Sequence, residues 1–245
     1  MGNMSVTKMK MPLPPKHKAK ILTICKTLKE NGYECYVVGG AVRDMLLGTR
    51  AYDFDFTTNA HPKDIIRLFK HTVPTGIKHG TVTVLIKKVP FELTTYRSEG
   101  KYTDGRRPEE VFFSKTLEED IVRRDFTING LVYDPIGEEL IDHVGGQEDL
   151  EKKIIRTIGD SVERLSEDGL RSYRACRFAA KLGFEIEEQT FEAIRSTLEV
   201  SAKVSVERVR EELMKIMASP KPSVGIDYLK DCGLLEQSLP ELYAA

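Results

Sequence analysis

The chain has 245 residues, of which 40% are hydrophobic and 31% charged. A chain of this length can bury a sizeable core and form one or two domains. Its formal net charge of −1 excludes a globally basic nucleic-acid binder, although local basic surfaces stay possible. No stretch approaches the ~20 apolar residues of a membrane span, and the N-terminus lacks the apolar core of a signal peptide. We therefore expect a soluble cytoplasmic protein.

Two features of composition concern the lysines near the N-terminus and the cysteines. Residues 8–20 contain five lysines and no acidic residue, which we interpret as a flexible arm or as a lead-in to the first helix. The four cysteines of the chain are scattered and show no C-x-x-C spacing. This spacing indicates neither a zinc site nor a disulfide framework and fits reduced thiols.

A glycine pair follows the apolar run 36–38. Gly39 and Gly40 have no Cβ, so the backbone there can approach a polyphosphate closely. Residues 41–47 have a helical pattern, and the N-terminal amides of such a helix would face the anion. Arg43 would add a positive charge.

Two aspartates come next, separated by one residue. In an extended chain, side chains alternate between the two faces, so Asp53 and Asp55 share one face, opposite Tyr52, Phe54 and Phe56. A carboxylate pair on one face suits Mg²⁺, which prefers oxygen ligands and completes its octahedron with water and substrate phosphates.

Each of these two motifs also has a plain structural interpretation. Gly39 and Gly40 would then form an ordinary turn, and Asp53 and Asp55 would lie on a solvated strand face. The close succession of the two motifs favours the functional interpretation.

The organisation of the chain changes near residue 150. Upstream, the β-rich runs 81–86 and 91–96, with a turn over 87–90, alternate with helical patterns and predict a mixed sheet with helices. Downstream, strand signals largely vanish. The apolar spacing of Ala175, Phe178, Ala179 and Leu182 predicts an amphipathic helix that ends at Gly183. Further helices are expected over 188–197, 205–218 and 224–232. We therefore predict an α+β domain over 1–150 and a helical domain over 151–245.

Further motifs follow the first two in order. They are the stretches 123–130, 142–146, 167–171 with Arg174 and Arg177, and 207–213. Together with 39–48 and 53–55, they resemble the family of class II tRNA nucleotidyltransferases and bacterial poly(A) polymerases. The likeness covers roughly 180 residues and is far more specific than a lone Gly-rich loop. It implies a polymerase-β-like nucleotidyltransferase head followed by an all-helical neck.

The resemblance also implies catalytic roles. Asp53 and Asp55 are expected to hold two Mg²⁺ ions, one at the RNA 3′-hydroxyl and one at the triphosphate. Glu92, on the adjacent β-rich run, is a candidate third carboxylate, and an ordinary exposed strand glutamate is the alternative. The expected phosphate contacts are Gly39, Gly40 and Arg43.

A second group of family positions follows at 124–129. The resemblance makes Arg124 and Asp125, with Asn129 behind them, contacts to sugar and phosphate. The alternative is a helix-capping aspartate with solvated arginines.

The motif at 167–171 would replace a nucleic-acid template with protein. Asp168 offers acceptors and Arg171 a planar fork of donors, so that side chains one helical turn apart can meet the Watson–Crick edge of a base. In the family, Glu167 is thought to orient Arg171, and Arg174 and Arg177 continue a basic stripe toward the nucleotide. The alternative is an exposed i,i+4 ion pair between Glu167 and Arg171, worth only ~0.2–0.5 kcal/mol.

The implied activity is template-independent transfer of CMP and AMP from CTP and ATP to the 3′ end of tRNA. The stretches 76–82 and 97–108 look more like those of CCA-adding enzymes than those of poly(A) polymerases, and we expect the charged, glycine-rich 97–108 loop to be mobile. The alternatives are an enzyme that adds only the terminal A, a poly(A) polymerase, and a non-catalytic nucleotide- or RNA-binding module.

Typical members of the family continue into helical body and tail segments that bind tRNA. We therefore expect a C-terminal helical region or a partner chain to supply that contact.

Overall fold

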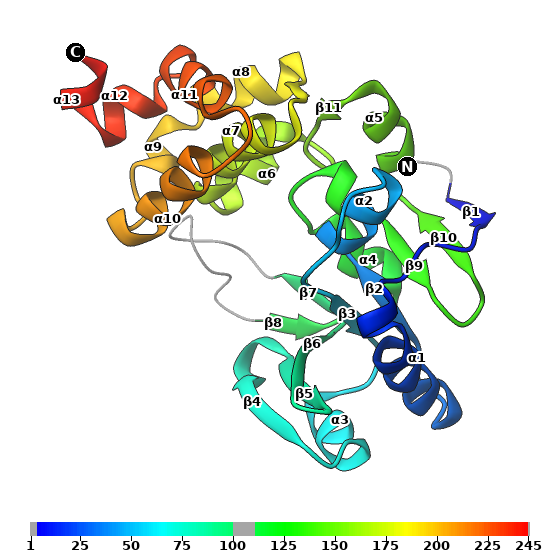
Figure 1. Ribbon diagram of the computed structural model, residues 1–245. Coiled ribbons are helices and arrows are strands. Elements are labelled where there is room, and N and C mark those ends of the chain that lie inside the picture. The colour runs from blue at the N-terminus through cyan, green and yellow to red at the C-terminus, as the bar shows by residue number, and fades with distance from the viewer. Residues whose placement is uncertain (1–3, 100–110, 245) are drawn as a thin grey trace. The chain divides into compact units, whose positions relative to one another are not determined.

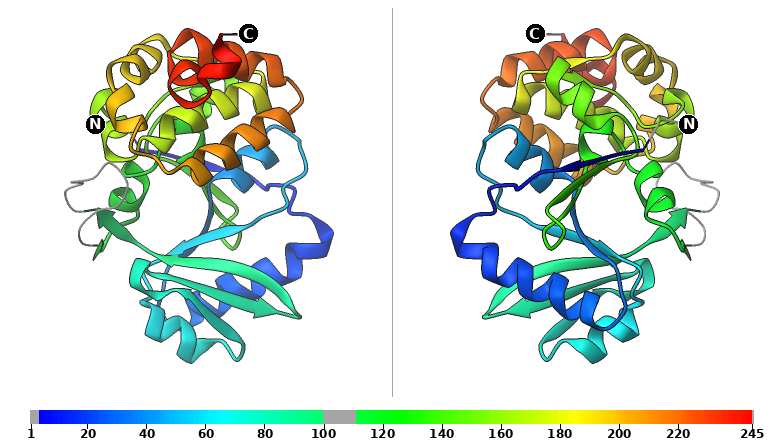
Figure 2. Two further views of the ribbon diagram at one scale, coloured as in Figure 1. Left: turned by 90° about the vertical axis from the view of Figure 1, so that its left-hand side faces the viewer. Right: turned by 90° about the vertical axis from the view of Figure 1, so that its right-hand side faces the viewer.

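The computed structural model describes residues 4–99 and 111–244. These residues form two units, which are treated separately. The first comprises the described residues of 1–99, 111–124 and 128–147, and the second comprises 125–127 and the described residues from 148 onward. The helices of the second unit, coloured from green through yellow to red, are followed most easily in the two views of Figure 2. Within the described residues, no helix is both long and apolar enough to cross a membrane.

The first unit is built on an eight-stranded mixed sheet (Figure 1), as the sequence predicted. In spatial order, its strands are β1 (Ser5–Lys8), β10 (Glu139–Asp142), β9 (Val132–Asp134), β2 (Cys35–Val38), β3 (Asp55–Thr58), β6 (Val89–Thr95), β5 (Thr81–Ile86) and β4 (Thr72–Gly76). The central strands β3 and β6 run parallel, and the other neighbours are antiparallel. A separate antiparallel pair joins β7 (Arg97–Glu99) to β8 (Val111–Phe113). The predicted mobile loop over 97–108 lies mostly outside the described residues.

The hairpin between β5 and β6 has a tighter turn than the sequence predicted. Only Lys87 and Lys88 form the turn, and their φ angles of 51° and 65° are those of the two-residue turns that match strand twist. Val89 and Pro90 belong to β6, where Pro90 lies opposite Leu85. The predicted four-residue turn over 87–90 was therefore two residues too long.

Short helices flank the sheet. They are α1 (Pro15–Glu30), α2 (Gly40–Leu46), α3 (Pro62–Leu68) and α4 (Leu117–Val122), with short 3-10 turns at Ile77–His79 and Thr127–Asn129. Helix α1 buries Ile21, Ile24, Cys25 and Leu28, which share one face at helical spacing.

The lysine-rich stretch 8–20 leads into helix α1, as one of the two interpretations predicted. The other interpretation, a flexible arm, was wrong for the start of the stretch, because Lys8 is the last residue of strand β1. The four cysteines are free thiols and buried.

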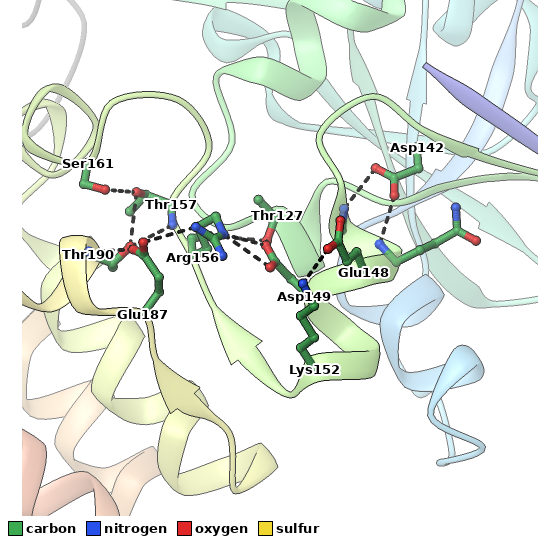
Figure 3. A network of polar contacts seen from close by, with 12 residues as sticks. Thr127, Asp142, Glu148, Asp149, Lys152, Arg156, Thr157, Ser161, Glu187 and Thr190 are labelled. Carbon is green, nitrogen blue, oxygen red and sulfur yellow. Dashed lines mark hydrogen bonds and ion pairs between the residues drawn. The ribbon is translucent and has the colours of Figure 1, made fainter. Parts of the chain in front are cut away.

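The family motif at 142–146 is a turn into helix α5 (Gly146–Lys152). The carboxylate of Asp142, labelled in Figure 3, accepts hydrogen bonds at 2.9–3.1 Å. Its donors are the backbone amides of Val144, Gly146 and Gln147. Gly145 has a φ of 75°, which favours glycine. The residues of this motif therefore have a structural role that follows from their own contacts.

The second unit is helical apart from one pair of two-residue strands, β11 (Ile154–Ile155) and β12 (Glu185–Ile186). Its helices are α6 (Ser161–Glu167), α7 (Leu170–Leu182), α8 (Glu188–Ser196), α9 (Leu198–Ser201), α10 (Val206–Met217), α11 (Pro222–Asp231), α12 (Leu234–Ser238) and α13 (Pro240–Tyr243). Helix α7 ends at Gly183, whose φ of 67° provides the left-handed cap, as predicted. The other three predicted helices are observed as α8, α10 and α11.

A polar network explains why residues 125–127 pack with the second unit. Asp149 accepts a hydrogen bond from the Thr127 hydroxyl at 2.7 Å and from Arg156 Nε at 3.1 Å (Figure 3). Arg156 in turn donates to Glu187, at the start of α8, at 3.1 Å. A backbone bridge between Phe126 and Thr157 adds to these contacts.

Candidate active site

The register of three strands brings the predicted carboxylates and the glycine turn together in the first unit. Asp55 is the first residue of β3, and it lies opposite Val38 of antiparallel β2 and opposite Glu92 of parallel β6. Neighbours in register point to the same face of a sheet, so Asp55 and Glu92 are adjacent on one face. Gly39 directly follows Val38 and therefore lies beside the start of β3.

Asp53 lies just before the strand, so the shared strand face predicted for the two aspartates forms only in part. Asp53 and Asp55 are exposed, whereas Phe54 and Phe56 are 4% and 1% exposed. This alternation confirms the expected division of faces for these four residues. Tyr52 is 68% exposed and packs against no core.

The three carboxylates have no direct cationic partner among the described residues. Within the described residues, none of Asp53, Asp55 and Glu92 forms an ion pair. The protein atoms around Asp55 displace water and raise the pKa of its carboxyl; the charges of Glu92 and Asp53 add to this rise, and Arg124 opposes it.

This donor set fits a hard divalent cation. Mg²⁺ prefers oxygen ligands and needs only one or two protein carboxylates, because water and phosphate complete its shell. In the part of the chain that the structure describes, no three or more His, Cys, Asp or Glu side chains stand close enough to form a ready-made metal cluster. The fit therefore rests on carboxylates placed by strand register, completed by other ligands.

The glycine turn lies beside Arg124 and Asn129 and has a backbone angle that favours glycine. Gly39 has a φ of 72° and caps helix α2, which begins at Gly40. A Cβ on Gly39 would lie 3.7 Å from Arg124 Nη1 and 4.0 Å from the carbonyl oxygen of Asn129. The turn therefore needs glycine for its backbone angle, and Arg124 and Asn129 lie directly beside it.

Arg43, predicted at the phosphates, is buried and paired. Its side chain is 3% exposed. Nε and Nη2 donate to Asp44 Oδ1 at 2.8 and 2.6 Å, and Nη1 donates to Asn129 Oδ1 at 2.6 Å. The Arg43 guanidinium therefore ties helix α2 to Asn129.

Arg124 is held by an acid that the sequence analysis missed. Its Nη2 donates to Asp120 Oδ2 at 3.1 Å, and its buried Nε has no hydrogen-bond partner among the described residues. Asp120 is fully buried. Burial alone would raise the pKa of Asp120, but Arg124 and Arg123 more than offset this effect and hold the pKa below its ordinary value. The i,i+4 spacing of Asp120 and Arg124 is the signal that could have identified the pair.

In the second unit, Asp125 is paired with Arg174. Its Oδ2 accepts from Arg174 Nε at 2.8 Å and also from Nη2, and its Oδ1 accepts from the amide of Phe126 at 2.8 Å. Burial alone would lower the pKa of Arg174, but Asp125 reverses this effect and raises it. The structure therefore brings together two residues that the sequence analysis placed in separate motifs.

Asp168 does not lie on one helix with Arg171, which corrects the predicted geometry. Helix α6 ends at Glu167 and α7 begins at Leu170, because Asp168 has an extended backbone with φ −147° and ψ 107°. The Asp168 carboxylate instead accepts from the amide of Leu170, the first residue of α7, at 3.0 Å, and Gly169 is the N-cap of that helix. Gly169 is needed at this break because a Cβ there would lie 2.6 Å from the carbonyl oxygen of Val200.

The carboxylate of Asp168 has a second partner, Arg208 of helix α10. Nη2 and Nη1 of Arg208 donate to its two oxygens at 2.9 and 3.3 Å. The sequence analysis quoted Arg208 as part of a family motif and gave it no role. No sequence signal identifies this pair, because 40 residues separate the partners.

Arg171 is held by Glu167, as the resemblance implied. Arg171 Nη1 donates to Glu167 Oε2 and, at 2.7 Å, to the carbonyl oxygen of Arg164. Arg164 Nη1 donates to the same Glu167 oxygen at 2.7 Å. Arg171 is only 8% exposed, so this contact is not the exposed surface pair of the alternative interpretation.

The last arginine of the predicted basic stripe is also neutralised. Arg177 Nε donates to Glu212 Oε2, and its guanidinium lies 4.2 Å from the ring centroid of Phe178. Glu212 is 2% exposed and also accepts from Lys215 at 2.9 Å. Burial would raise the pKa of Glu212, but Arg177 and Lys215 lower it.

Comparison with known proteins gives the family. Residues 35–156 match the Poly A polymerase head domain, and residues 183–245 match the probable RNA and SrmB-binding site of polymerase A. The CCA-adding enzyme of Lactobacillus johnsonii is 46% identical over 216 residues, which are 88% of this chain and 54% of that protein.

Solved structures agree with this match. The Bacillus stearothermophilus CCA-adding enzyme in complex with CTP has a TM-score of 0.83 and 40% identity, over 91% of this chain and 53% of that one. The Thermotoga maritima CCA-adding enzyme complexed with tRNA has a TM-score of 0.78 and 26% identity, over 94% and 54%. The chain thus spans about half the length of the relatives it matches. It belongs to the family of tRNA nucleotidyltransferases and bacterial poly(A) polymerases, and it has that family's polymerase-β-like head fold followed by the helical neck.

Proposed function

We propose that this chain carries the nucleotide-transfer chemistry of a CCA-adding tRNA nucleotidyltransferase. It would transfer CMP and AMP from CTP and ATP to the 3′ end of tRNA without a nucleic-acid template. The observation that carries the proposal is the register of β2, β3 and β6, which places Asp55 beside Glu92 and beside the glycine turn. The match to CCA-adding enzymes supports it.

Asp53 and Asp55 are the proposed metal ligands, with Glu92 as a third carboxylate. Two Mg²⁺ ions bound there would lower the pKa of the RNA 3′-hydroxyl and neutralise the triphosphate. The pKa of the Asp55 carboxyl is raised mainly because the surrounding protein displaces water, and repulsion from Glu92 and Asp53 adds to the rise. A bound cation would relieve that repulsion, which supports this assignment.

The glycine turn and Arg124 are the proposed phosphate contacts. Gly39 and Gly40 form the turn into α2, whose first amides would face an anion, and Arg124 has a buried Nε donor that no described residue satisfies. Arg43 and Asn129 support the turn through their mutual hydrogen bond. We therefore assign to Arg43 the positioning of the turn and of Asn129 as well as a contribution of positive charge.

Asp168 and Arg171 are the proposed base-reading pair. Arg171 is already oriented by Glu167, whereas Asp168 is bound to Arg208. A base that hydrogen-bonds to Asp168 must share or replace the Arg208 contact. Asp125, Arg174 and Arg177 then hold the start and the middle of α7 in place through their own ion pairs.

A nucleotide-addition assay tests the proposal. The substrates are tRNAs that end before the first C, after the first C and after the second C, each incubated with labelled CTP or ATP and Mg²⁺. We expect CMP on the first two and AMP on the third. AMP addition to the third tRNA, without CMP addition to the other two, would indicate an A-adding enzyme. Long A tails on any RNA would indicate a poly(A) polymerase. Nucleotide binding without transfer would leave only a binding module.

A further inference from the structure

Asp120, on helix α4 of the first unit, collects hydrogen bonds from three parts of the chain and is fully buried. Its Oδ1 accepts from Arg123 Nε and Nη2 at 3.0 and 2.7 Å, and from the backbone amide of Arg97 at 3.3 Å. Its Oδ2 accepts from the Thr57 hydroxyl at 2.9 Å and from Arg124 Nη2 at 3.1 Å. One buried acid thus binds two consecutive arginines and a strand of the sheet.

These contacts lie on the face of the sheet that carries Asp55. Thr57 is two residues beyond Asp55 on β3, so the two side chains point to the same face. The hydrogen bond from Thr57 to Asp120 therefore places α4 on that face. Ile121, the next residue of α4, packs in a core cluster with Val38, which directly precedes the glycine turn. Helix α4 is thus fixed both to β3 and to the end of β2.

Arg124 lies one turn after Asp120 and reaches the glycine turn. A Cβ on Gly39 would lie 3.7 Å from Arg124 Nη1. Burial raises the pKa of the Asp55 carboxyl, and the positive charge of Arg124 opposes this rise. The Arg124 guanidinium is therefore close to the proposed phosphate-binding turn and acts on a proposed metal ligand.

The two arginines contact Asp120 in different ways. Arg123 binds one carboxylate oxygen through two nitrogens, whereas Arg124 binds the other oxygen through Nη2. The buried Nε of Arg124 has no hydrogen-bond partner among the described residues. Two guanidinium groups thus share one carboxylate, and Arg124 is held in place while it keeps a donor for an anion.

We infer that Asp120 is a positioning residue for nucleotide binding, which fixes the Arg124 guanidinium at the glycine turn so that it contacts the triphosphate. This inference rests on the proposed phosphate contact of Arg124 and adds the buried acid that supports it. Positioning and charge predict opposite effects, because a negative charge near the site repels an anion. Removing the charge of Asp120 should tighten triphosphate binding if only charge matters, and should weaken it if Asp120 positions Arg124.

The variant Asp120→Asn separates these roles. An amide has one oxygen acceptor and one NH2 donor group. Its oxygen keeps the most hydrogen bonds in the place of Oδ1, where it accepts from Arg97 and Arg123. The NH2 group then takes the place of Oδ2. The Thr57 hydroxyl can reverse its hydrogen bond and accept from this group, but Arg124 has no acceptor and must move away.

Calorimetry with Mg²⁺ measures the binding of CTP and of inorganic tripolyphosphate to the parent and to Asp120→Asn. We expect the variant to bind both ligands at least about tenfold more weakly, as for the loss of one charge-assisted hydrogen bond. In an Arg124→Gln background, Asp120→Asn should change either affinity by less than about twofold, because Arg124 is the group through which Asp120 acts.

The matched control is Thr57→Val, which removes a hydrogen bond to the same carboxylate and leaves both arginines bound. It should lower the free energy of unfolding in urea and leave the affinity for tripolyphosphate within about twofold of that of the parent.

Arg124→Lys tests the inference without altering the buried acid, and so also covers an Asp120→Asn variant that does not fold. Lysine keeps the positive charge but has a single nitrogen, which cannot replace the separate nitrogens that bind Asp120 and the phosphate. The affinity for tripolyphosphate should therefore fall by about fivefold or more.

Several outcomes overturn the inference. One is parental or tighter binding by folded Asp120→Asn, and another is parental binding by Arg124→Lys. An equal loss of affinity in Thr57→Val would show that the contacts of Asp120 serve the fold alone, and a parent that binds neither ligand would remove the phosphate site itself. Failure of the proposed function has a different signature, because tripolyphosphate binding would then still depend on Asp120 while no nucleotide is transferred to tRNA.

Discussion

The carboxylates of the proposed catalytic site and those of the proposed base-reading site differ in their partners. In the first unit, strand register places Asp55 beside Glu92, Asp53 lies two residues before Asp55, and within the described residues none of the three forms an ion pair. In the second, the carboxylates at the proposed base-reading site are matched with arginines, as in Asp168 with Arg208 and Glu167 with Arg171. The first arrangement stores repulsion that an incoming cation relieves. The second offers hydrogen-bonding groups that are already satisfied and must exchange partners.

This difference predicts different consequences of mutation. Removing Asp53, Asp55 or Glu92 from the first unit should remove chemistry and leave the fold intact. Removing a paired carboxylate from the second unit should leave an arginine without its partner, and so should affect stability or selectivity.

The largest expected effect is on catalysis. Asp53→Ala and Asp55→Ala should each lower nucleotide transfer about a thousandfold or more, because a catalytic metal supplies several kcal/mol of charge stabilisation and 1.36 kcal/mol corresponds to a factor of ten in rate. The measurement is single-turnover incorporation of labelled CMP with Mg²⁺. Glu118→Ala, which removes an exposed acid on α4, should behave as the parent. Transfer by both aspartate variants at near-parental rates would contradict the metal assignment.

A large effect on stability is expected at the buried pair of the second unit. Glu212 is almost fully buried, and its removal leaves Arg177 with only 13% of its side chain exposed and no acid partner at this contact. Breaking a buried pair in this way costs about 3–5 kcal/mol, and the remaining exposure of Arg177 places the expectation at about 3 kcal/mol. Urea unfolding of Glu212→Ala measures it.

The matched control for this experiment is Glu211→Ala, which removes the exposed neighbouring acid of the same helix. It should change the free energy of unfolding by less than about 0.5 kcal/mol. Equal effects of the two variants would show that the buried pair makes no special contribution, and that the contrast between the units does not extend to stability.

The third effect concerns nucleotide selection. Asp168→Ala should slow CTP use and relax discrimination against UTP and GTP by roughly tenfold, because the base edge loses an acceptor worth about 1–1.5 kcal/mol. Competition among the four nucleotides measures this selectivity. A variant with unchanged selectivity would leave Asp168 only its structural contacts, to the Leu170 amide and to Arg208.

A substitution of Arg208 provides a second test of the role of Asp168. Arg208→Lys keeps the charge but loses the two-pronged contact, so it should shift selectivity in the same direction and by less than Asp168→Ala. Arg210→Lys, on the exposed side of the same helix, is the control. A double variant with Asp168→Ala should add little to Asp168→Ala alone, because Arg208 is proposed to act through that carboxylate.

Much of this arrangement could be predicted from the sequence, and the exceptions have identifiable causes. Short-range patterns were sufficient for the helix after Gly39, for the helix that ends at Gly183, and for the alternation of Asp53 and Asp55 with Phe54 and Phe56. The α+β class and its helical second part follow from the same periodicities. These features depend on residues within a few positions of one another, where steric and burial preferences act directly.

The failures concern contacts between distant residues. The break at Asp168 and Gly169 interrupts a continuous helical pattern because the chain there passes close to Val200, and no local signal records that approach. The pairs Asp168 with Arg208 and Asp125 with Arg174 join residues 40 and 49 positions apart. Arg43 looked like a free cation in the sequence, and only its burial against Asn129 revealed its supporting role.

The smallest effect concerns stability and pH at the catalytic carboxylates. The pKa of Asp55 is raised in the folded protein, first because its surroundings displace water and then because of Glu92 and Asp53. The folded state therefore binds the proton more tightly than the unfolded state, and stability falls as the pH rises from the ordinary pKa of a carboxyl through the raised value. The asparagine side chain of the Asp55→Asn variant cannot ionise, so this variant does not lose stability in this way as the pH rises.

We therefore expect the metal-free Asp55→Asn variant to melt at a temperature a few degrees above that of the parent at pH 7, and this advantage to shrink as the pH is lowered toward 4. Added Mg²⁺ should narrow the gap by stabilising the parent alone, because binding to the folded state raises its apparent stability. Asp227→Asn, at an exposed position on α11, should show none of these changes. An Asp55→Asn variant that melts below the parent at neutral pH would mean that this carboxylate supports the fold. The proposed difference between the unpaired catalytic carboxylates and the paired carboxylates of the base-reading site would then be wrong.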